Sequence, residues 1–311
     1  MIVYLGEVDV FADLLTEVRA NGALFCRSIM TPPWAVRFEN SASLSLYTML
    51  RGDSWLIPGG GDPVRLRAGD IAVTRRPAPH LIADDPTATP KIMIHSADSW
   101  TDAGGHRWLG PHTCGEHANG PAQLLTGAYQ VVGHVGERLL RALPEVLVVP
   151  AGTGPGPLLE LVAAELADER PGQQVVLDRS LDWLLVGTLR AWFAQPDVSP
   201  PAWYRALADP VVGAALRLIH DEPARAWTVA ALAEGAGVSR AALARRFTDL
   251  VGQPPLTYLT GWRMTLAADY LRAPGATIAS VARRVGYNDG FAFSSAFKRV
   301  RGIPPSAHRA S

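Results

Sequence analysis

The sequence predicts a multidomain α+β protein, with a β-barrel toward its N-terminus, helices in its centre and an all-α region at its C-terminus. Short apolar runs separated by Pro, Gly and Asp clusters fill residues 23–132, which is typical of a β-sandwich or barrel. After residue 156, apolar residues recur every three or four positions, the period of an amphipathic helix. The last third contains one helical motif twice, which indicates a duplicated unit.

The size and composition of the chain favour two or three domains. Its 311 residues are 48% hydrophobic, enough for more than one core, and we divide them into residues 1–150, 151–204 and 205–311. The sequence has no run of about 18 apolar residues and no basic leader segment. Its two cysteines, Cys26 and Cys114, suit a reducing compartment. We therefore expect a cytoplasmic protein that does not associate with a membrane.

Charge is distributed unequally along the chain, although the formal net charge is zero. From Arg205 to the C-terminus there are 14 Lys plus Arg residues and 7 Asp plus Glu residues, and the remainder has the opposite surplus of 7. A basic region beside an acidic one indicates a nucleic-acid-binding domain fused to a different domain. A chance imbalance among solvated side chains is the alternative interpretation.

Helices are predicted on either side of the β-rich region. Residues 1–20 are expected to form a helix that stops at residues 21–22, Asn and Gly. Residues 158–169 and 180–194 predict two amphipathic helices, and the prolines of residues 196–204 predict a linker. The two central helices either pair with a second subunit to make a homodimer or cover the barrel within one chain. Both interpretations remain open.

The duplicated motif consists of residues 228–259 and 277–309. In each copy a Thr can cap a first helix, a Gly follows where the chain reverses, and a second helix begins near Ser239 or Asp289. This order is the helix-turn-helix pattern, whose second helix fits a DNA major groove about 12 Å wide. The paired positions are Thr228 and Thr277, Gly237 and Gly286, and Phe247 and Phe297.

The stretch GYNDGFAFSSAFKRVRGIPP, residues 286–305, resembles the AraC family of bacterial transcription regulators, and the resemblance covers residues 210–309. It implies two helix-turn-helix units joined by a long helix over residues 256–272. These units would face major-groove segments of double-stranded DNA about 34 Å apart. The resemblance also implies a regulator that is commonly an activator, in which case RNA polymerase is a further partner.

The resemblance assigns base contacts to the first unit. The positions that face base edges in the family are occupied by Arg240, Ala241 and Arg245. We expect Arg245 to read the sequence, because an Arg side chain can pair with guanine O6 and N7. Arg246 either folds back onto its helix or contacts a phosphate.

The second unit departs from the family pattern. Where the family often has a long polar or basic side chain, this chain has short or apolar ones, so we expect weak base reading. Lys298 and Arg299 are expected to contact the DNA backbone, whose contacts position the protein rather than specify a sequence. Asn288 either caps the second helix or adds a polar contact. The departing positions are Gly290, Phe291, Ser294 and Ser295.

The N-terminal region carries a second resemblance. The Pro-Trp-x-x-Arg-Phe stretch of residues 33–38 and the Leu-x-Ala-Gly-Asp stretch that leads to His80 resemble the cupin-type sensor domain of one branch of this family, over residues 5–150. The resemblance implies a cupin-like β-barrel that binds a small ligand or a metal in its mouth. Trp34 and His80 are candidate ligand-binding residues, and each is alternatively a core residue.

Residues 104–120 form the stretch richest in reactive side chains. Cys114 and His117 are spaced to bind one Zn²⁺ or another transition metal from a turn, and His112, His80 or Cys26 would have to complete the coordination. Alternatively Cys114 and Cys26 form a thiol redox pair, since a neighbouring His lowers the pKa of a Cys. A loop with incidental polar residues is the third interpretation, and all three remain open.

Together these features predict a DNA-binding transcription regulator that senses a small ligand, a metal or an oxidant, and that has no catalytic residues. A metal-dependent cupin enzyme with an appended DNA-binding module is the alternative. The absence of a His-x-His pair with a downstream Glu cluster weighs against the enzyme. An architectural protein that binds DNA without a signal is a third hypothesis.

Overall fold

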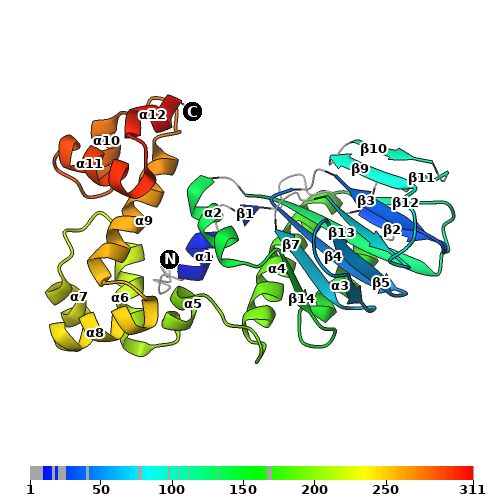
Figure 1. Cartoon of the computed structure of the whole chain (residues 1–311), viewed down its shortest axis with the longest axis horizontal. Coiled ribbons are helices and arrows are strands. Elements are labelled where there is room, and N and C mark those ends of the chain that lie inside the picture. Colours follow the sequence, from blue (N-terminus) through cyan, green and yellow to red (C-terminus); the bar gives the residue numbers. More distant parts are fainter. Residues whose placement is uncertain are drawn as a thin grey trace. The chain divides into compact units, whose positions relative to one another are not determined.

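The chain folds into two units, each built from separate stretches of sequence. One unit consists of Met1–Glu17, Val132–Ala142 and Pro200–Ser311, and the other of Val18–Val131 and Leu143–Ser199. The computed structural model describes residues 10–15, 18–19, 26–39, 42–75, 79–96, 99–103, 105–110, 112–131, 133–166 and 170–310 (Figure 1). Within these residues, no helix has the length and apolar character needed to cross a bilayer. The predicted boundaries at residues 150 and 204 stay a prediction.

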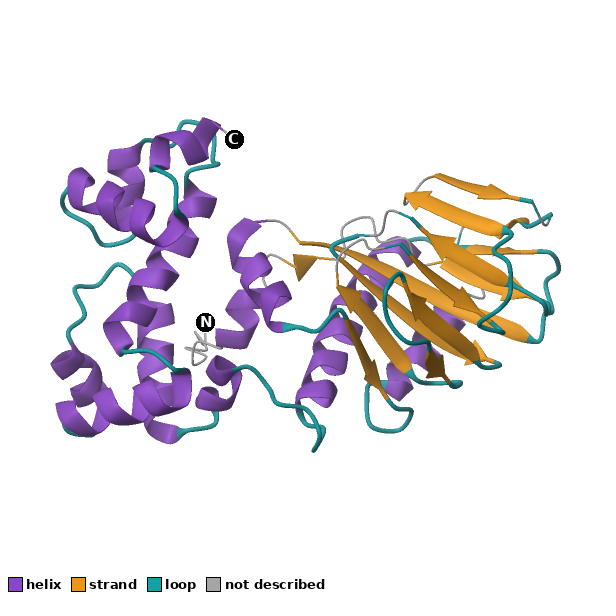
Figure 2. Ribbon diagram, viewed as in Figure 1, coloured by secondary structure: helices purple, strands orange, loops and turns teal. Residues whose placement is uncertain are grey.

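The larger of two sheets in the β-rich unit has eight strands among the described residues. Their order is β11-β12-β2-β13-β4-β7-β14, and β1 pairs with β13 beside this path (Figure 2). Most neighbours are antiparallel, whereas β2 and β12 are parallel. The strands are β1 (Val18–Arg19), β2 (Cys26–Met30), β4 (Leu44–Arg51), β7 (Ile71–Arg75), β11 (Arg107–Gly110), β12 (Thr113–Gly115), β13 (Ala122–Val131) and β14 (Val146–Val149).

The second sheet has six strands among the described residues, in the order β10-β9-β3-β8-β5-β6. Residues of both sheets share one buried cluster, which includes Val36 and Phe38 of one sheet and Tyr47 and Met49 of the other. This core is built by alternate residues of facing strands, as in a β-sandwich. The strands are β3 (Ala35–Phe38), β5 (Ser54–Pro58), β6 (Val64–Leu66), β8 (His80–Ala83), β9 (Ile92–Ser96) and β10 (Ser99–Asp102).

Two helices, α3 (Gly156–Glu165) and α4 (Gln173–Phe193), belong to the same unit. The Tyr129 hydroxyl of β13 donates a hydrogen bond of 2.8 Å to the Leu181 carbonyl of α4, so α4 covers the face of the larger sheet opposite the shared core (Figure 2). A strand covered on both faces buries consecutive residues. This explains why β4 is buried from its first residue through Met49.

Three helices before residue 210 differ from the prediction. The expected helix over residues 1–20 is α1 (Val10–Leu15), and Val18 lies instead in β1, where it pairs with Val131 of β13. Tertiary pairing overrides local helix propensity here, and residues 21–22, the expected stop, lie outside the described part. The helices α2 (Gly133–Ala142) and α5 (Ala202–Leu207) were not predicted.

The remaining helices form the double helix-turn-helix that the repeat predicted. In the first copy the Thr228 hydroxyl accepts a hydrogen bond of 3.1 Å from the Ala231 amide, and in the second Thr277 forms a reciprocal capping box with Ser280. The helices are α6 (Pro210–Asp221), α7 (Val229–Gly235), α8 (Arg240–Val251), α9 (Pro255–Tyr270), α10 (Ile278–Arg284), α11 (Gly290–Arg301) and α12 (Pro305–Ala310).

Helix α9 contributes buried side chains to both helix-turn-helix cores. Near its start, Tyr258 packs edge-on against Phe247 of α8, with ring centroids 5.8 Å apart. Near its end, Met264 and Ala268 share a buried cluster with Phe293 and Phe297 of α11. The joining helix predicted over residues 256–272 is therefore also a structural part of the two units that it joins.

The helices α1 and α2, distant in sequence, complete this helical unit. His220 of α6 lies 2.9 Å from the Asp13 carboxylate of α1 and 2.9 Å from the Tyr258 hydroxyl. The Asp269 carboxylate of α9 accepts hydrogen bonds from the His134 and Val135 amides at 2.7 and 3.1 Å. Asp269 therefore satisfies two of the unpaired amides at the N-terminus of α2, the position where a negative charge is most stabilising.

We expect Gly286→Ala to lower the free energy of unfolding by about 2 kcal/mol more than Gly275→Ala. Both glycines have a left-handed φ, +83° and +77°, so each substitution costs about 1 kcal/mol for the backbone alone. At Gly286 the added Cβ would also collide with the Ala224 carbonyl oxygen, whereas at Gly275 no atom lies within 4 Å. Urea denaturation of the two variants checks this, and equal losses would contradict it.

Candidate functional site

The recognition helix of the first unit, α8, exposes the residues predicted to face base edges. Arg240, Ala241 and Arg245 are exposed, while Leu243 and Phe247 on the opposite face are buried. Ser239 caps the helix by accepting a hydrogen bond from the Ala242 amide at 3.2 Å. The exposed face is free of apolar packing and presents two guanidinium groups, so it is suited to base and phosphate contacts.

Arg246 has a different environment from its neighbours on α8. Its Nε donates a hydrogen bond of 2.8 Å to the Asp209 carboxylate, and its Nη2 lies 2.7 Å from the same oxygen. Asp209 is also the N-cap of α6. Arg246 is therefore held against its own unit, as in the interpretation in which it folds back.

The recognition helix of the second unit, α11, is capped by Asp289. Its carboxylate accepts hydrogen bonds from the Phe291 and Ala292 amides at 3.1 and 2.9 Å. The capping role considered for Asn288 is therefore wrong, because the next residue fills it, and Asn288 is exposed beside the cap. Ser294 is half-buried, and its hydroxyl donates to the Gly290 carbonyl at 2.8 Å.

The remaining DNA-facing candidates of α11 are exposed. Phe291 has 81% of its surface exposed, an unusual state for a large apolar side chain. Ser295, Lys298 and Arg299 are exposed as well. These positions agree with the predicted phosphate contacts of the two basic residues, and the assignment of individual DNA contacts stays a prediction.

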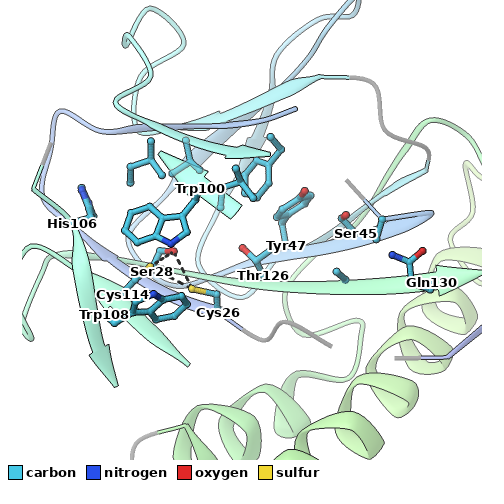
Figure 3. Close-up of a pocket in the computed structure, with 16 residues that line it drawn as sticks. Cys26, Ser28, Ser45, Tyr47, Trp100, His106, Trp108, Cys114, Thr126 and Gln130 are labelled. Carbon is cyan, nitrogen blue, oxygen red and sulfur yellow. Dashed lines mark hydrogen bonds between the residues drawn. The ribbon is translucent and has the colours of Figure 1, made fainter. Parts of the chain in front are cut away.

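A second candidate site is a pocket between the two sheets of the β-rich unit (Figure 3). Its volume is about 260 Å³, large enough for a small organic molecule. Its walls are mostly aromatic and aliphatic, and its polar groups include two thiols. The lining residues are Cys26, Ser28, Val36, Phe38, Ala42, Ser45, Tyr47, Ile92, Ile94, Trp100, His106, Trp108, Cys114, Thr126, Ala128 and Gln130.

The two cysteines meet at one side of this pocket. Parallel pairing of β12 with β2 places Cys114 opposite Ser28, and the Sγ atoms of Cys26 and Cys114 lie 3.4 Å apart. The Ser28 hydroxyl lies 3.3 Å from the Cys114 sulfur (Figure 3). Both thiols are free. Cys26 lies two residues before Ser28, diagonal to Cys114, so a disulfide bond of about 2.05 Å requires a shift of the two strands as well as of the side chains.

The contacts around the pair make its thiols unequal. A hydrogen bond with Cys26 lowers the pKa of Cys114 to about 7, and the Ser28 hydroxyl acts in the same direction. The same sulfur–sulfur contact, together with burial, raises the pKa of Cys26. Cys114 is therefore the thiol of the pair that ionises more readily, and Cys26 is the one that retains its proton to higher pH.

The structure places the predicted ligand-binding residues outside the pocket lining. Trp34 is buried in the core shared by the two sheets. His80 is buried behind the pocket wall, where its Nε2 lies 2.8 Å from the hydroxyl of the lining residue Tyr47. Trp34 thus matches its core interpretation, and His80 supports the wall from behind.

The predicted metal ligands are not assembled into a site. His117 is exposed, and His112 is half-buried in a turn, where its carbonyl accepts a hydrogen bond from the Arg27 amide at 2.8 Å. Among the described residues, no group of three or more His, Cys, Asp or Glu side chains is arranged to hold a metal ion. Cys114 lies with Cys26 and Ser28 instead, because β12 pairs with β2.

The two tryptophans that line the pocket were not predicted from the sequence. Trp100 of β10 and Trp108 of β11 pack edge-on with ring centroids 6.2 Å apart. These two strands belong to different sheets, so no local pattern joins them. The spacing of Trp108 and Cys114 about a short hairpin was the one signal that could have linked an aromatic residue to the thiol.

Comparison with known families accounts for most of the chain. A family model described as a cupin matches residues 9–194, and one described as a helix-turn-helix domain matches residues 232–311. A model for bacterial regulatory proteins of the tetR family also matches residues 211–249, which span α6 to α8. The two larger matches agree with the β-rich region and the duplicated motif.

The relatives that match are transcription regulators rather than enzymes. An AraC-like transcription regulator of Streptomyces lividans is 33% identical over 97% of this chain and 98% of its own length. The HTH-type transcriptional regulator AlkR of Acinetobacter baylyi is 28% identical over 97% and 99%. The RCS-specific HTH-type transcriptional activator RclR of Escherichia coli is 25% identical over 83% and 89%.

A solved structure, the C-terminal domain of the response regulator AraT from Geobacillus stearothermophilus, is similar to part of the chain. It is 31% identical and covers 33% of this chain and 86% of that chain, with a TM-score of 0.32. The shared portion is about a third of the present chain.

We expect Arg245→Ala and Lys298→Ala to affect DNA binding differently. Loss of a base-reading Arg should cost about 1–3 kcal/mol and relax the preference at one base pair. Loss of a phosphate contact should weaken binding to all sequences alike and reduce the salt dependence of the affinity. Fluorescence anisotropy on operator and random duplexes at several salt concentrations measures both. Equal losses on the two duplexes for both variants would contradict the assigned roles.

Proposed function

Because the chain belongs to the AraC family of transcription regulators with an N-terminal cupin domain, we propose that the redox state of Cys26 and Cys114 controls its binding to DNA. The observation that carries the proposal is the separation of 3.4 Å between the two sulfurs at the wall of an internal pocket. The protein is a DNA-binding regulator, and the thiol pair is its sensor.

The signal in this proposal is a two-electron oxidant, a hydroperoxide. The Cys114 thiolate attacks one peroxide oxygen, the O–O bond breaks, and the leaving oxygen takes a proton to form water or an alcohol. The resulting sulfenic acid of Cys114 is attacked by the Cys26 sulfur. A disulfide forms, and the hydroxyl leaves with the Cys26 proton as water. The position of Cys26 beside Cys114 favours this second step.

The chain order supplies a route from the thiols to the DNA-binding helices. β13 pairs with β2, which carries Cys26, and α2 follows β13 in the sequence. The Asp269 carboxylate of α9 accepts hydrogen bonds from the first amides of α2. Helix α9 in turn packs into the cores of both helix-turn-helix units. A disulfide that displaces β2 and β13 would thereby shift the population of two arrangements of the helical unit.

The metal and small-ligand interpretations receive different support. The described residues offer no metal cluster, so the sensing proposal rests on thiols rather than on His112, Cys114 and His117. The apolar pocket does favour a small ligand in addition to an oxidant.

The helices α3 and α4 support the proposed homodimer. Val176 and Trp183 lie two turns apart on α4 and are 48% and 61% exposed, and Leu161 of α3 is 62% exposed. Exposed apolar residues at helical spacing favour pairing with a second copy, which analytical ultracentrifugation measures. We place the regulator in the cytoplasm, and an activator would also contact RNA polymerase there.

We expect hydrogen peroxide to form the Cys26–Cys114 disulfide and to change the affinity for the operator in the wild type. Cys114→Ser and Cys26→Ser should bind operator DNA as the reduced protein does and should not respond. Intact mass detects the loss of two hydrogens, and anisotropy measures the affinity. Variants that respond to peroxide as the wild type does would contradict the proposal.

The rate of this oxidation should also depend on pH in a defined direction. Because the thiolate is the nucleophile and the pKa of Cys114 is about 7, the rate should fall about tenfold per pH unit well below 7 and level off above it. A rate that continues to rise beyond pH 8.5, as for an ordinary cysteine, would contradict the assignment of Cys114 as the reactive thiol.

A further inference from the structure

We propose that the pocket of the β-rich unit binds small apolar molecules with an α,β-unsaturated carbonyl group and that Cys114 forms a thioether with them. The inference rests on the proposed role of Cys114 as the reactive thiol and adds a class of ligand to it. It does not require Cys26 as a reaction partner.

The pocket walls match a small unsaturated or aromatic molecule. Trp100 and Trp108 form an edge-to-face pair, and Phe38, Ile92 and Ile94 add further apolar surface. At about 260 Å³ the pocket is slightly smaller than those that hold drug-sized ligands, about 300–1,000 Å³. A molecule with one ring therefore fits, and its burial against aromatic walls supplies the binding energy.

One buried polar group of the pocket lacks a hydrogen-bond partner. The His106 side chain is only 4% exposed, and neither of its ring nitrogens makes a hydrogen bond with the described residues. Its Nδ1 lies 3.4 Å from Asp102 Oδ1. The other ring nitrogen, Nε2, has neither a hydrogen bond nor an ion pair with the described residues, which costs free energy for a buried polar atom. A ligand carbonyl oxygen would accept a hydrogen bond from this Nε2–H.

The reaction balances without an oxidant. The Cys114 thiolate attacks the β-carbon of the unsaturated carbonyl and forms the C–S bond, while the π electrons of the C=C bond move to give an enolate. The α-carbon then takes a proton from water. Because no second thiol takes part, the adduct and the disulfide are alternative products of the same thiolate.

Cinnamaldehyde is a suitable probe, with iodoacetamide as a thiol reagent that needs no apolar pocket. We expect one cinnamaldehyde adduct per chain, mapped to Cys114 by peptide mass spectrometry. Cys26→Ser should keep the adduct although it cannot form the disulfide. Trp108→Ala, at a half-exposed position, should slow the cinnamaldehyde reaction about fivefold and leave the iodoacetamide reaction nearly unchanged.

The outcomes separate this inference from the redox proposal. An adduct at another residue, or equal slowing of both reagents by Trp108→Ala, overturns the pocket inference and leaves the disulfide proposal standing. Failure of iodoacetamide to modify Cys114 faster than an exposed cysteine of a peptide overturns the reactive thiol itself, and with it both proposals.

A second inference comes independently from the DNA-binding helices. We infer that Phe291 reads the 5-methyl group of a thymine in the part of the operator that faces α11. Phe291 occupies the first turn of α11 and is 81% exposed. Residues at the start of a recognition helix are those that reach base edges in the major groove.

The neighbours of Phe291 leave it as the main group that can reach a base. Gly290 has no side chain, the Ser294 hydroxyl is engaged by the Gly290 carbonyl, and Ser295 is short. An aromatic ring cannot donate to guanine, but apolar contact with the thymine methyl is a recognised pairing in the major groove. The second unit thus recognises an apolar feature of DNA, whereas Arg245 of the first unit offers hydrogen bonds.

Replacement of thymine by 2′-deoxyuridine removes only this methyl group and tests the inference. The operator is first selected from random duplexes with the full-length protein. One such replacement should then weaken binding of the wild type about fourfold, the change in affinity that corresponds to burying one methyl group. The same replacement should have no effect on Phe291→Ala, and Phe291→Leu should be intermediate. The inference is wrong if no position is sensitive or if Phe291→Ala keeps the full discrimination.

Discussion

The packing of α9 is the constraint on which the DNA-binding unit depends. Tyr258 at one end of this helix packs against Phe247, and Met264 and Ala268 at the other end pack against Phe293 and Phe297. Neither helix-turn-helix could keep its core if α9 moved relative to it. The spacing of the two recognition helices is consequently set by a single rigid element, and rigid spacing is what a duplex with a fixed helical repeat requires.

The two sites differ in their chemistry and in how they are built. The DNA-facing residues lie on helices whose ends are fixed by local caps, Ser239 and Asp289. The thiol pocket is assembled from strands of two sheets and is lined by groups that come from much of the β-rich region. Local caps suit a surface that must be preformed, whereas a pocket between sheets can respond to what enters it.

This difference also explains what could be predicted from the sequence. Helix-turn-helix units are specified by caps, glycines and apolar spacing within about twenty residues, so their positions were predicted to within a few residues. The contact of Cys26 with Cys114 joins residues separated by 88 positions and depends on the parallel pairing of β2 with β12, which no local pattern encodes. For the same reason Trp100 and Trp108 were not predicted. Trp34 and His80, which the cupin resemblance suggested as ligand-binding residues, are buried outside the lining of this pocket.

The order in which the chain is synthesised has a consequence for the helical unit. Every strand described in the β-rich unit, together with α3 and α4, precedes residue 194, so that unit can fold before the helix-turn-helix units are synthesised. Asp13 of α1 contacts His220, which is synthesised 207 positions later. The first amides of α2 are bound by Asp269, which is synthesised later still. A nascent chain stalled before α6 would therefore contain all the strands described in the sensor unit, while α1 and α2 would still lack His220 and Asp269 and would be exposed to chaperones and proteases.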